Sequence, residues 1–351
     1  MNLVGSTLLT LFSFANLCFA NEQPATAKPV KVAFIGDSGY KGHFKKVLKL
    51  IKEENVDLVL HSGDLAYHEG DSDSPKNWNQ RINDVLGETF PYLFLIGNHD
   101  VPHWFQENDV NYASLLKKRI ADNPEIVCHG EPGIKSYCTF RGILFILSGV
   151  GSYGEGHEEY LEQTLSTPTR TPFRICAWHK NQEDMQTGFK PDEVGWQAYQ
   201  ICQKHGAMIM TGHEHTYART KNLNKLGNRA ENYGAHGNPE IMELKPGNTF
   251  VVVSGLGGNE LYPFNCKHNH DTWWASLYSD KFQMRNGVLK FDTCKEPHTA
   301  MNNEHFEFTY GALFITFNVN GNPNLAKAEF KTIQGDIVDN FDILVQDYPS
   351  K

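Results

Sequence analysis

The chain has no excess of basic residues, and this absence narrows the range of its partners. It carries 32 Lys and Arg residues against 41 Asp and Glu residues, which gives a formal net charge of -9. Affinity for a nucleic-acid backbone depends on clustered Lys and Arg and on the counterions that they release. We therefore expect no nucleic-acid binding patch. An acidic chain binds phosphate only where something local reverses its field, and a bound metal ion does so.

Other sequence patterns are missing as well, and each absence excludes a class of protein or of site. No Cys-x-x-Cys spacing suggests a zinc site, and no heptad pattern or internal repeat indicates a coiled coil or an array. Beyond residue 20, no apolar run is long enough to span a membrane. The 351 residues are 40% hydrophobic, 12% aromatic and 21% charged, which is the composition of a globular protein with a core.

Charged residues are also absent from positions 1–20. The apolar run Leu3–Phe14 has the length of a signal-peptide core, and Cys18 and Ala20 supply small residues before a cleavage site. A buried first strand or helix is the alternative. The first interpretation predicts a secreted or periplasmic protein. It divides the chain into a signal peptide over 1–20, a short linker over 21–30 and a single domain over 31–351.

Six cysteines remain after residue 20, an even number that favours disulfides in an exported chain. Six cysteines allow 15 pairings, and the sequence alone does not choose among them. We predict pairing between sequence neighbours, because the first pair flanks a turn that contains Gly and Pro. Buried free thiols are the alternative. The predicted pairs are Cys128–Cys138, Cys176–Cys202 and Cys266–Cys294.

Apolar periodicity indicates alternating strands and helices. Val32–Ile35 and Asp57–His61 are typical of buried strands, and the residues between them predict an amphipathic helix, which makes a parallel βαβ unit. The apolar positions of that helix are Phe44, Val47, Leu48 and Ile51. Further strands are predicted at Tyr92–Ile96, Ile143–Leu147, Arg174–Trp178, Met208–Met210 and Phe250–Val253, with helices around 109–121, 157–165 and 192–205. This alternation predicts a layered α/β fold.

The remaining segments carry weaker patterns. Residues 286–346 predict short strands that form a closing sheet. Residues 221–248 and 259–280 are predicted to be long loops, the second carrying histidines and tryptophans. We expect these aromatic residues to pack within the loop, and a substrate rim is the alternative. The residues in question are His268, His270, Trp273 and Trp274.

Metal-type donors follow five of the predicted strands. The motifs are GDSG, GDLAY, GNHD, AWHK and GHEHTY, and four of them begin with a glycine that lets the backbone approach a small ion. Ligands bind beyond the carboxyl ends of parallel strands, so we expect these side chains to converge. His213 and His215 are expected to alternate on a strand and so to face one side. Each motif alone is more typical of a turn, but five in this order point to one site.

The set of donors indicates more than one metal ion. The candidate donors are Asp37, Asp64, Tyr67, Asn98, His179, His213 and His215. Seven donors are too many for one transition-metal ion and suffice for two ions that share a carboxylate. Mixed nitrogen and oxygen donors suit iron, manganese or zinc rather than calcium or magnesium. Asp100 is expected to orient a ligand or His99 rather than to bind metal itself.

These motifs resemble those of the metallophosphoesterase (calcineurin-like) superfamily, and within it the purple acid phosphatases. The commoner superfamily pattern opens with Asp-x-His, whereas Gly39 stands at the third position here. Tyr67 follows Asp64 by three residues, as it does in purple acid phosphatases. The resemblance covers roughly residues 32–219. It implies a four-layer α/β/β/α sandwich of two mixed sheets, with the metal site at the carboxyl ends of the strands.

The resemblance also implies a role for each donor. Asp37, Tyr67 and His215 would hold Fe(III), and Asn98, His179 and His213 would hold Fe(II), Zn(II) or Mn(II), with Asp64 bridging the two ions. A metal-bound hydroxide would attack phosphorus. His99 would protonate the leaving group or bind phosphate, and Asn98 and His103 are further candidates for contacts with the substrate.

Several functions share this donor set. The resemblance favours an exported acid phosphatase that hydrolyses phosphate monoesters in small molecules. A phosphodiesterase or nucleotidase on the same metal core is the alternative, because the fold supports both. A relative that has lost activity and serves as a secreted binding protein is a third. The sequence does not reveal the physiological substrate, the second metal or the oligomeric state.

Overall fold

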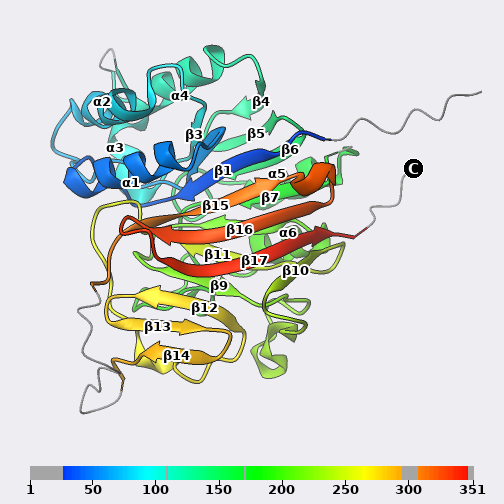
Figure 1. Cartoon of the computed structure of the whole chain (residues 1–351). Helices are drawn as coiled ribbons and strands as arrows, with labels where there is room; N and C mark the ends of the chain where they lie inside the picture. Colours follow the sequence, from blue (N-terminus) through cyan, green and yellow to red (C-terminus); the bar gives the residue numbers. More distant parts are fainter. Residues whose placement is uncertain (1–26, 108–109, 170, 295–306, 347–351) are drawn as a thin grey trace, which may run out of the picture.

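Two mixed β-sheets form the centre of the molecule. A computed structural model describes residues 27–107, 110–169, 171–294 and 307–346, so the predicted signal peptide lies outside the described residues. The seven-stranded sheet faces the viewer in Figure 1, with the ten-stranded sheet behind it. The seven-stranded sheet contains β1 (Val30–Ile35), β15 (Gly311–Phe317), β16 (Leu325–Thr332) and β17 (Ile337–Val345). Among the described residues, no helix combines the length and the apolar character that a membrane crossing requires.

The predicted βαβ unit is present at the start of the domain. Strand β1 (Val30–Ile35) lies parallel to β2 (Leu58–His61), and α1 (Gly42–Glu53) connects them. The four apolar positions that predict α1 are all completely buried, whereas its lysines face outward. The helix ends where Asn55 adopts a left-handed conformation with φ of 52°. The apolar periodicity of the sequence is therefore sufficient to predict this βαβ unit.

The seven-stranded sheet adds five strands to this unit: one parallel to β2, the three C-terminal strands, and one more strand that is parallel to the last of them. Strand β15 pairs antiparallel with β1, which makes the sheet mixed. The order of the sheet is β10 (Ile241–Leu244), β17 (Ile337–Val345), β16 (Leu325–Thr332), β15 (Gly311–Phe317), β1, β2 and β3 (Tyr92–Phe94). Strand β10 lies inside the predicted loop 221–248, and that prediction is wrong for these four residues, because their backbone groups pair with β17.

The ten-stranded sheet has a parallel centre and antiparallel flanks. Its order is β14 (Val288–Phe291), β13 (Phe282–Arg285), β12 (Trp274–Ser279), β9 (Tyr217–Thr220), β11 (Val251–Ser254), β8 (Met208–Thr211), β7 (Phe173–Ala177), β6 (Ile143–Ser148), β5 (Lys135–Phe140) and β4 (Ile126–Glu131). Strand β12 is completely buried and lies inside the predicted loop 259–280, so that prediction is also wrong there.

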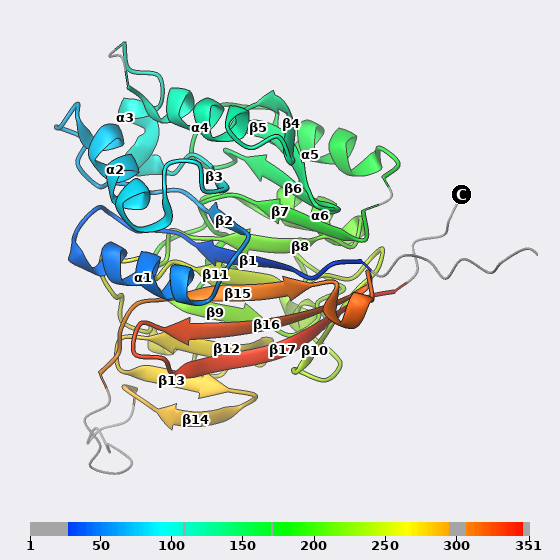
Figure 2. The ribbon, with the colours of Figure 1, turned by 45° about the horizontal axis from the view of Figure 1, so that its top comes forward.

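Helices cover the outer face of each sheet and create two cores. Helix α1 packs on α2 (Ser74–Leu86), a helix absent from the sequence predictions, and α5 (His157–Ser166) packs on α6 (Gln197–Lys204). Along β7, Ile175 and Ala177 belong to the core between the sheets, whereas Cys176 belongs to the core beneath α5 and α6. The other helices are α3 (Val101–Trp104) and α4 (Tyr112–Ala121). The layers therefore form the α/β/β/α sandwich that the resemblance implies (Figure 2).

Helix α6 begins five residues later than predicted. The Asp192 side chain accepts hydrogen bonds from the backbone nitrogens of Val194 and Gly195, which forms a turn before the helix. Gly195 has a φ of 71°, a left-handed conformation that a right-handed helix cannot contain. The turn therefore competes with the helix for these backbone groups.

A buried ion pair joins the two sheets. Arg219 on β9 donates from Nε to Asp339 Oδ2 at 2.7 Å and from Nη2 to Asp339 Oδ1 at 3.0 Å, and Asp339 lies on β17. The Tyr217 hydroxyl donates to the same carboxylate at 2.8 Å. Both charged side chains are completely buried, so each depends on the other for compensation. This contact fixes the position of β9, which directly follows the last predicted metal motif.

Three disulfides confirm the predicted pairing of sequence neighbours. The bonds join Cys128 to Cys138, Cys176 to Cys202 and Cys266 to Cys294. The first links β4 to β5, and the second ties β7 to α6. The third fastens the segment that contains His268 and Trp273, both of which are buried, as expected for loop packing.

Candidate metal centre

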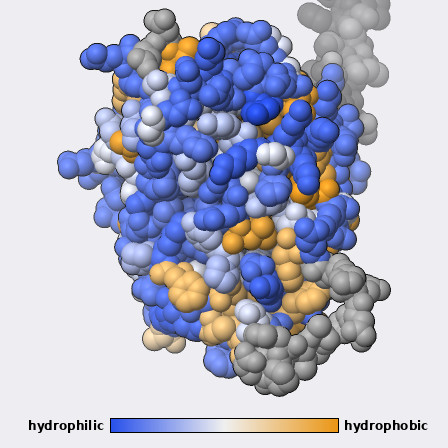
Figure 3. Space-filling view, turned by 90° about the vertical axis from the view of Figure 1, so that its left-hand side faces the viewer, coloured by the Kyte–Doolittle hydropathy of each residue, from blue (hydrophilic) through white to orange (hydrophobic). Residues whose placement is uncertain are grey.

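The strand ends bring the predicted donors to one edge of the sandwich. Asp37 follows β1, Asp64 follows β2, Asn98 follows β3, His179 follows β7 and His213 follows β8. This edge lies on the left of Figure 1, and Figure 3 views the molecule from that side. The surface there is mostly hydrophilic, with apolar residues gathered below its centre.

Three of the donor atoms form a first group. The Tyr67 hydroxyl donates a hydrogen bond to Asp37 Oδ1 at 2.8 Å and lies 2.8 Å from His215 Nε2. His215 Nε2 lies 3.4 Å from Asp37 Oδ1, so the three atoms are all within hydrogen-bond distance or close to it. Their convergence is the geometry in which a carboxylate, a phenol and an imidazole could hold one ion.

A second group lies beside the first. His179 Nε2 is 3.0 Å from Asp64 Oδ2, and His213 Nδ1 is 3.1 Å from His179 Nε2. One donor atom from each of these three residues lies within 4.8 Å of the others, a spacing that could hold a metal ion. The two groups meet where His179 Nε2 lies 4.0 Å from Asp37 Oδ1.

Asn98 carries a buried polar atom that lacks a partner. Among the described residues, no group hydrogen-bonds to Asn98 Oδ1, although this atom is shielded from solvent. Such an atom normally finds a partner, because leaving it unpaired costs about 1–3 kcal/mol. A metal ion would satisfy the amide oxygen, so its position fits a ligand.

The backbone at the donors is held in an unusual conformation. Asp37, Asp64, Tyr67 and His213 have φ values of 59°, 57°, 59° and 69°, in the left-handed region. Each non-glycine residue in that region costs about 1–3 kcal/mol, and such costs cluster at functional sites. The surrounding structure must therefore hold these turns in place.

Glycines allow the turns to pack closely, as the sequence motifs predict. A Cβ atom on Gly97 would lie 2.2 Å from Asp64 Oδ1, and one on Gly212 would lie 2.7 Å from Asp37 Oδ2. Asp100 adds support, because its carboxylate accepts hydrogen bonds from the backbone nitrogens of Asp64, Leu65 and Gly97, each at 2.8 Å. Asp100 therefore holds the backbone of the Asp64 turn rather than the His99 ring.

The buried carboxylates of the site need a positively charged partner. Asp37 and Asp64 are almost completely buried, and their ion-pair partners in the described part of the chain are histidines, with no lysine or arginine beside them. Burial alone would lower the pKa of His179, but the carboxylates of Asp64 and Asp37 raise it to about 9. Buried carboxylates are costly without positive charge, so bound metal ions fit this donor set.

The histidine rings are oriented by partners outside the two groups. His179 Nδ1 donates to the carbonyl oxygen of Ser62 at 2.7 Å, which leaves Nε2 directed toward Asp64. His213 Nε2 contacts Glu193 Oε2 at 2.6 Å, and Nδ1 faces His179. Glu193 lies in a polar loop and belongs to no recognisable motif, so no sequence pattern marks it as a functional residue. A carboxylate beside a predicted histidine ligand is visible only in three dimensions.

His99 lies at the opening of the site. Its backbone nitrogen donates to Asp64 Oδ1 at 3.0 Å, its Nε2 lies 3.9 Å from Asp64 Oδ2, and 38% of its side chain is exposed. The other ring nitrogen contacts Glu69, a second carboxylate that no sequence motif marks. His99 is thus both close to the donors and open to a ligand.

Three candidate histidines lie in surroundings that differ from those that their sequence motifs suggest. His213 and His215 do not alternate on a strand, because β8 ends at Thr211 and β9 begins at Tyr217. Both still reach the site, through the left-handed turn at His213. His103 lies in α3 and is buried, with its ring nitrogens 2.6 Å from Gln106 Oε1 and 3.3 Å from the carbonyl oxygen of His68.

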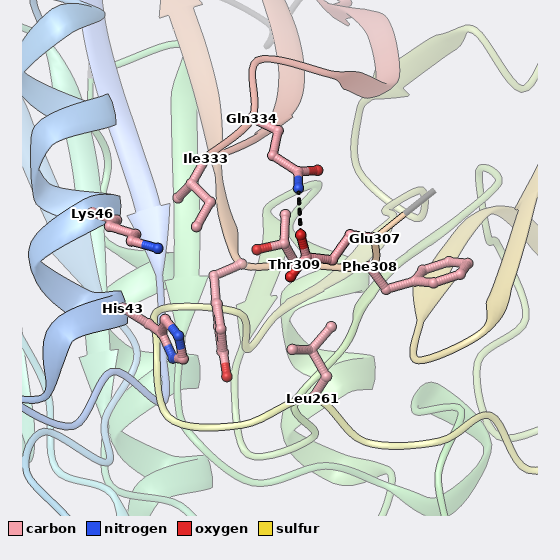
Figure 4. Close-up of a pocket in the computed structure, with 9 residues that line it drawn as sticks. His43, Lys46, Leu261, Glu307, Phe308, Thr309, Ile333 and Gln334 are labelled. Atoms are coloured by element: carbon pink, nitrogen blue, oxygen red, sulfur yellow. Dashed lines mark hydrogen bonds between the residues drawn. The ribbon is translucent and has the colours of Figure 1, made fainter. Parts of the chain in front are cut away.

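A separate pocket lies beside the site. It measures about 410 Å³, and Figure 4 shows His43 and Lys46 of α1 facing Glu307, which accepts a hydrogen bond from Gln334. Leu261 lines this pocket, whereas the neighbouring Tyr262 stacks on His215 with 4.0 Å between ring centroids. The loop that carries Leu261 and Tyr262 thus separates the pocket from the metal donors.

The chain combines a two-sheet sandwich with oxygen and nitrogen donors at the ends of its strands. This combination is typical of metal-dependent phosphoesterases. The calcineurin-like phosphoesterase family matches residues 30–217, more than half of the 351 residues, and the chain belongs to that family. Purple acid phosphatase 21 of Arabidopsis thaliana is 23% identical over 279 residues, which cover 73% of this chain and 62% of that protein. These matches confirm the resemblance to purple acid phosphatases.

Solved structures agree on the fold. A purple acid phosphatase from seeds of yellow lupin, Lupinus luteus, has a TM-score of 0.60 at 18% identity and covers 92% of this chain and 55% of that one. GAP50, described as the anchor in the inner membrane complex of Plasmodium, has a TM-score of 0.50 at 13% identity and covers 92% and 90%. The chain thus spans 62% and 55% of the length of the Arabidopsis and lupin phosphatases.

Proposed function

We propose that the protein is an exported acid phosphatase that hydrolyses phosphate monoesters at a centre of two metal ions. The observation that carries this proposal is the convergence of two groups of donor atoms, which meet where His179 Nε2 lies 4.0 Å from Asp37 Oδ1, beside an accessible histidine. Family membership supports the hydrolytic chemistry. The three disulfides support export, because such bonds persist in oxidising compartments.

The resemblance to purple acid phosphatases assigns the ligands to the two ions, and the two groups of donor atoms support this assignment. Asp37, Tyr67 and His215 would hold the first ion, which we propose to be Fe(III), because a phenolate is a hard anionic donor. Asn98, His179 and His213 would hold a divalent Fe, Zn or Mn ion, and Asp64, whose Oδ2 lies 3.0 Å from His179 Nε2, would be the carboxylate that the two ions share. When bound, the ions would supply Lewis-acid polarisation of the phosphate and activation of a water molecule.

The side chains of the protein provide the remaining functions. His99 would donate a proton to the leaving oxygen, because its ring stands at the opening of the site. The Glu69 carboxylate contacts His99 Nδ1 and would keep Nε2 directed toward the substrate. The Asn98 amide would contact the phosphate as well as the metal. His103 stays a prediction as a substrate contact, since both of its ring nitrogens face other groups.

A comparison of two substrates at pH 5 tests this proposal. We expect the purified protein to hydrolyse a phosphomonoester such as phenyl phosphate faster than bis(phenyl) phosphate, because the monoester has one more unesterified phosphate oxygen available to the metal ions and only one organic group to accommodate. Faster hydrolysis of the bis-ester would instead favour the phosphodiesterase alternative. A protein that binds metal and hydrolyses neither ester would contradict the enzymatic proposal and favour a binding role.

A further inference from the structure

One side of His213 is held by a segment that follows another predicted ligand, His179. Glu193 Oε2 lies 2.6 Å from His213 Nε2, on the side of the ring that points away from the other donors. The opposite ring nitrogen, Nδ1, lies 3.1 Å from His179 Nε2 within the second donor group. The His213 side chain is only 8% exposed, so no bulk water competes strongly for this contact.

The contact decides which nitrogen of His213 is available to a metal. A neutral imidazole carries its proton on one nitrogen and a lone pair on the other. A carboxylate accepts but does not donate, so Glu193 keeps the proton on Nε2 and leaves the lone pair on Nδ1. That lone pair is the one directed into the donor group.

Glu193 is itself anchored by its surroundings. Lys180 Nζ donates to Glu193 Oε1 at 2.5 Å, and the Glu193 backbone nitrogen donates to the carbonyl oxygen of Asn181 at 3.1 Å. Asn181 is completely buried and donates from Nδ2 to the carbonyl oxygen of Gly212 at 2.7 Å. Residues 180–193 therefore connect the His179 turn to the His213 turn.

The same segment contacts the backbone of His213. Lys190 Nζ donates to the His213 carbonyl oxygen and lies 5.0 Å from the centroid of the Tyr262 ring. His213 is thus held at its ring by Glu193 and at its backbone by Lys190. This double support suits a residue whose φ of 69° is costly without outside contacts.

We propose that Glu193 is a positioning residue that fixes the tautomer and the ring orientation of His213 for metal binding. The inference rests on the metal centre of the proposed function but not on its substrate. Carboxylates that accept the second N–H of a ligating histidine typically change metal affinity about 10- to 100-fold when removed. The segment that follows His179 thereby couples two ligands of the second ion.

Zinc titration of the metal-stripped full-length protein tests this role. We expect Glu193→Ala to weaken the binding of one of the two zinc ions about 10- to 100-fold, as measured by isothermal titration calorimetry. Glu193→Gln should recover most of the affinity, because the amide retains an acceptor oxygen at the same place. Glu183→Ala is the matched control, since Glu183 pairs with Lys267 at 2.6 Å on the surface, away from the donors.

A second readout does not depend on metal. The ¹⁵N chemical shifts of histidine side chains distinguish a ring protonated at Nε2 from one protonated at Nδ1. We expect His213 to be protonated at Nε2 in the wild type and in Glu193→Gln. A His213 protonated at Nδ1 in the wild-type protein would overturn the proposal even if Glu193→Ala failed to fold.

The outcomes separate this inference from the proposed function. Zinc affinity of Glu193→Ala equal to that of the wild type would overturn the role of Glu193 and leave the metal centre intact. Weaker zinc binding by Glu193→Ala, together with a wild-type protein that hydrolyses no phosphate ester, would support the role of Glu193 and contradict the phosphatase proposal. A wild-type chain that binds no zinc would overturn both.

Discussion

Replacement of His99 by asparagine is expected to lower the turnover of an alkyl phosphomonoester about 10²- to 10⁴-fold, the usual contribution of a general acid. The His99 ring stands at the opening of the site with Nε2 3.9 Å from Asp64 Oδ2, where it can reach a leaving oxygen. Asparagine retains a polar side chain but cannot supply a proton. Steady-state kinetics at pH 5 give kcat directly.

Two comparisons isolate the proton-transfer role of His99. The loss should be much smaller with nitrophenyl phosphate, because a nitrophenolate leaves without a proton. His43→Asn is the matched control, since His43 is exposed and lines the pocket beyond the Leu261 loop. Unchanged turnover of the alkyl ester by His99→Asn would remove His99 from the mechanism.

Replacement of Gly97 by alanine is expected to disrupt the metal centre. The added Cβ atom would lie 2.2 Å from Asp64 Oδ1 and 2.3 Å from the Asp64 backbone nitrogen, distances that real structures do not tolerate. The Asp64 carboxylate must therefore move, and we expect hydrolysis to fall to background. Overpacking of this kind lowers the free energy of unfolding by about 1–3 kcal/mol.

Urea unfolding and metal analysis of Gly97→Ala measure the two effects. Gly42→Ala is the matched control, because no heavy atom lies within 4 Å of its added Cβ atom. We expect Gly42→Ala to bind metal as the wild type does. A Gly97→Ala protein with full metal content and activity would show that Asp64 is not held against Gly97.

The elements with regular apolar spacing were predictable from sequence. In α1, Phe44, Val47, Leu48 and Ile51 repeat with the helical period, and all four are completely buried. The convergence of Asp37, Asp64, Asn98, His179 and His213 at one edge was predictable because each follows the end of an apolar strand, and parallel strands end at one edge. These patterns involve only residues that are close together in the sequence, so they can be recognised without knowing which distant strand each element contacts.

The missed strands depend on distant partners. The four residues of β10 pair with β17, where Ile241 lies opposite Asp342 about a hundred residues later. Strand β12 is buried on both faces, so it shows no alternation that would distinguish it from a loop rich in aromatic residues. Neither segment carries a periodic pattern of its own.

The supporting carboxylates were missed for a related reason. Glu193 lies 20 residues before His213, and Glu69 lies 30 residues before His99. Both occupy polar loops, where a glutamate is usually a solvated side chain. The left-handed backbone at Asp37 and Asp64 was equally invisible, although the glycines before them indicate tight turns.

The metal content of the purified protein, measured together with its visible spectrum, tests the central claim most directly. We expect about two ions per chain, with iron among them, and a visible absorption band that disappears in Tyr67→Phe, whose missing hydroxyl lies 2.8 Å from both Asp37 Oδ1 and His215 Nε2. Tyr262→Phe should keep the band, because Tyr262 touches His215 through its ring face. A folded wild-type chain that retains no iron, zinc or manganese after incubation with each would contradict the account.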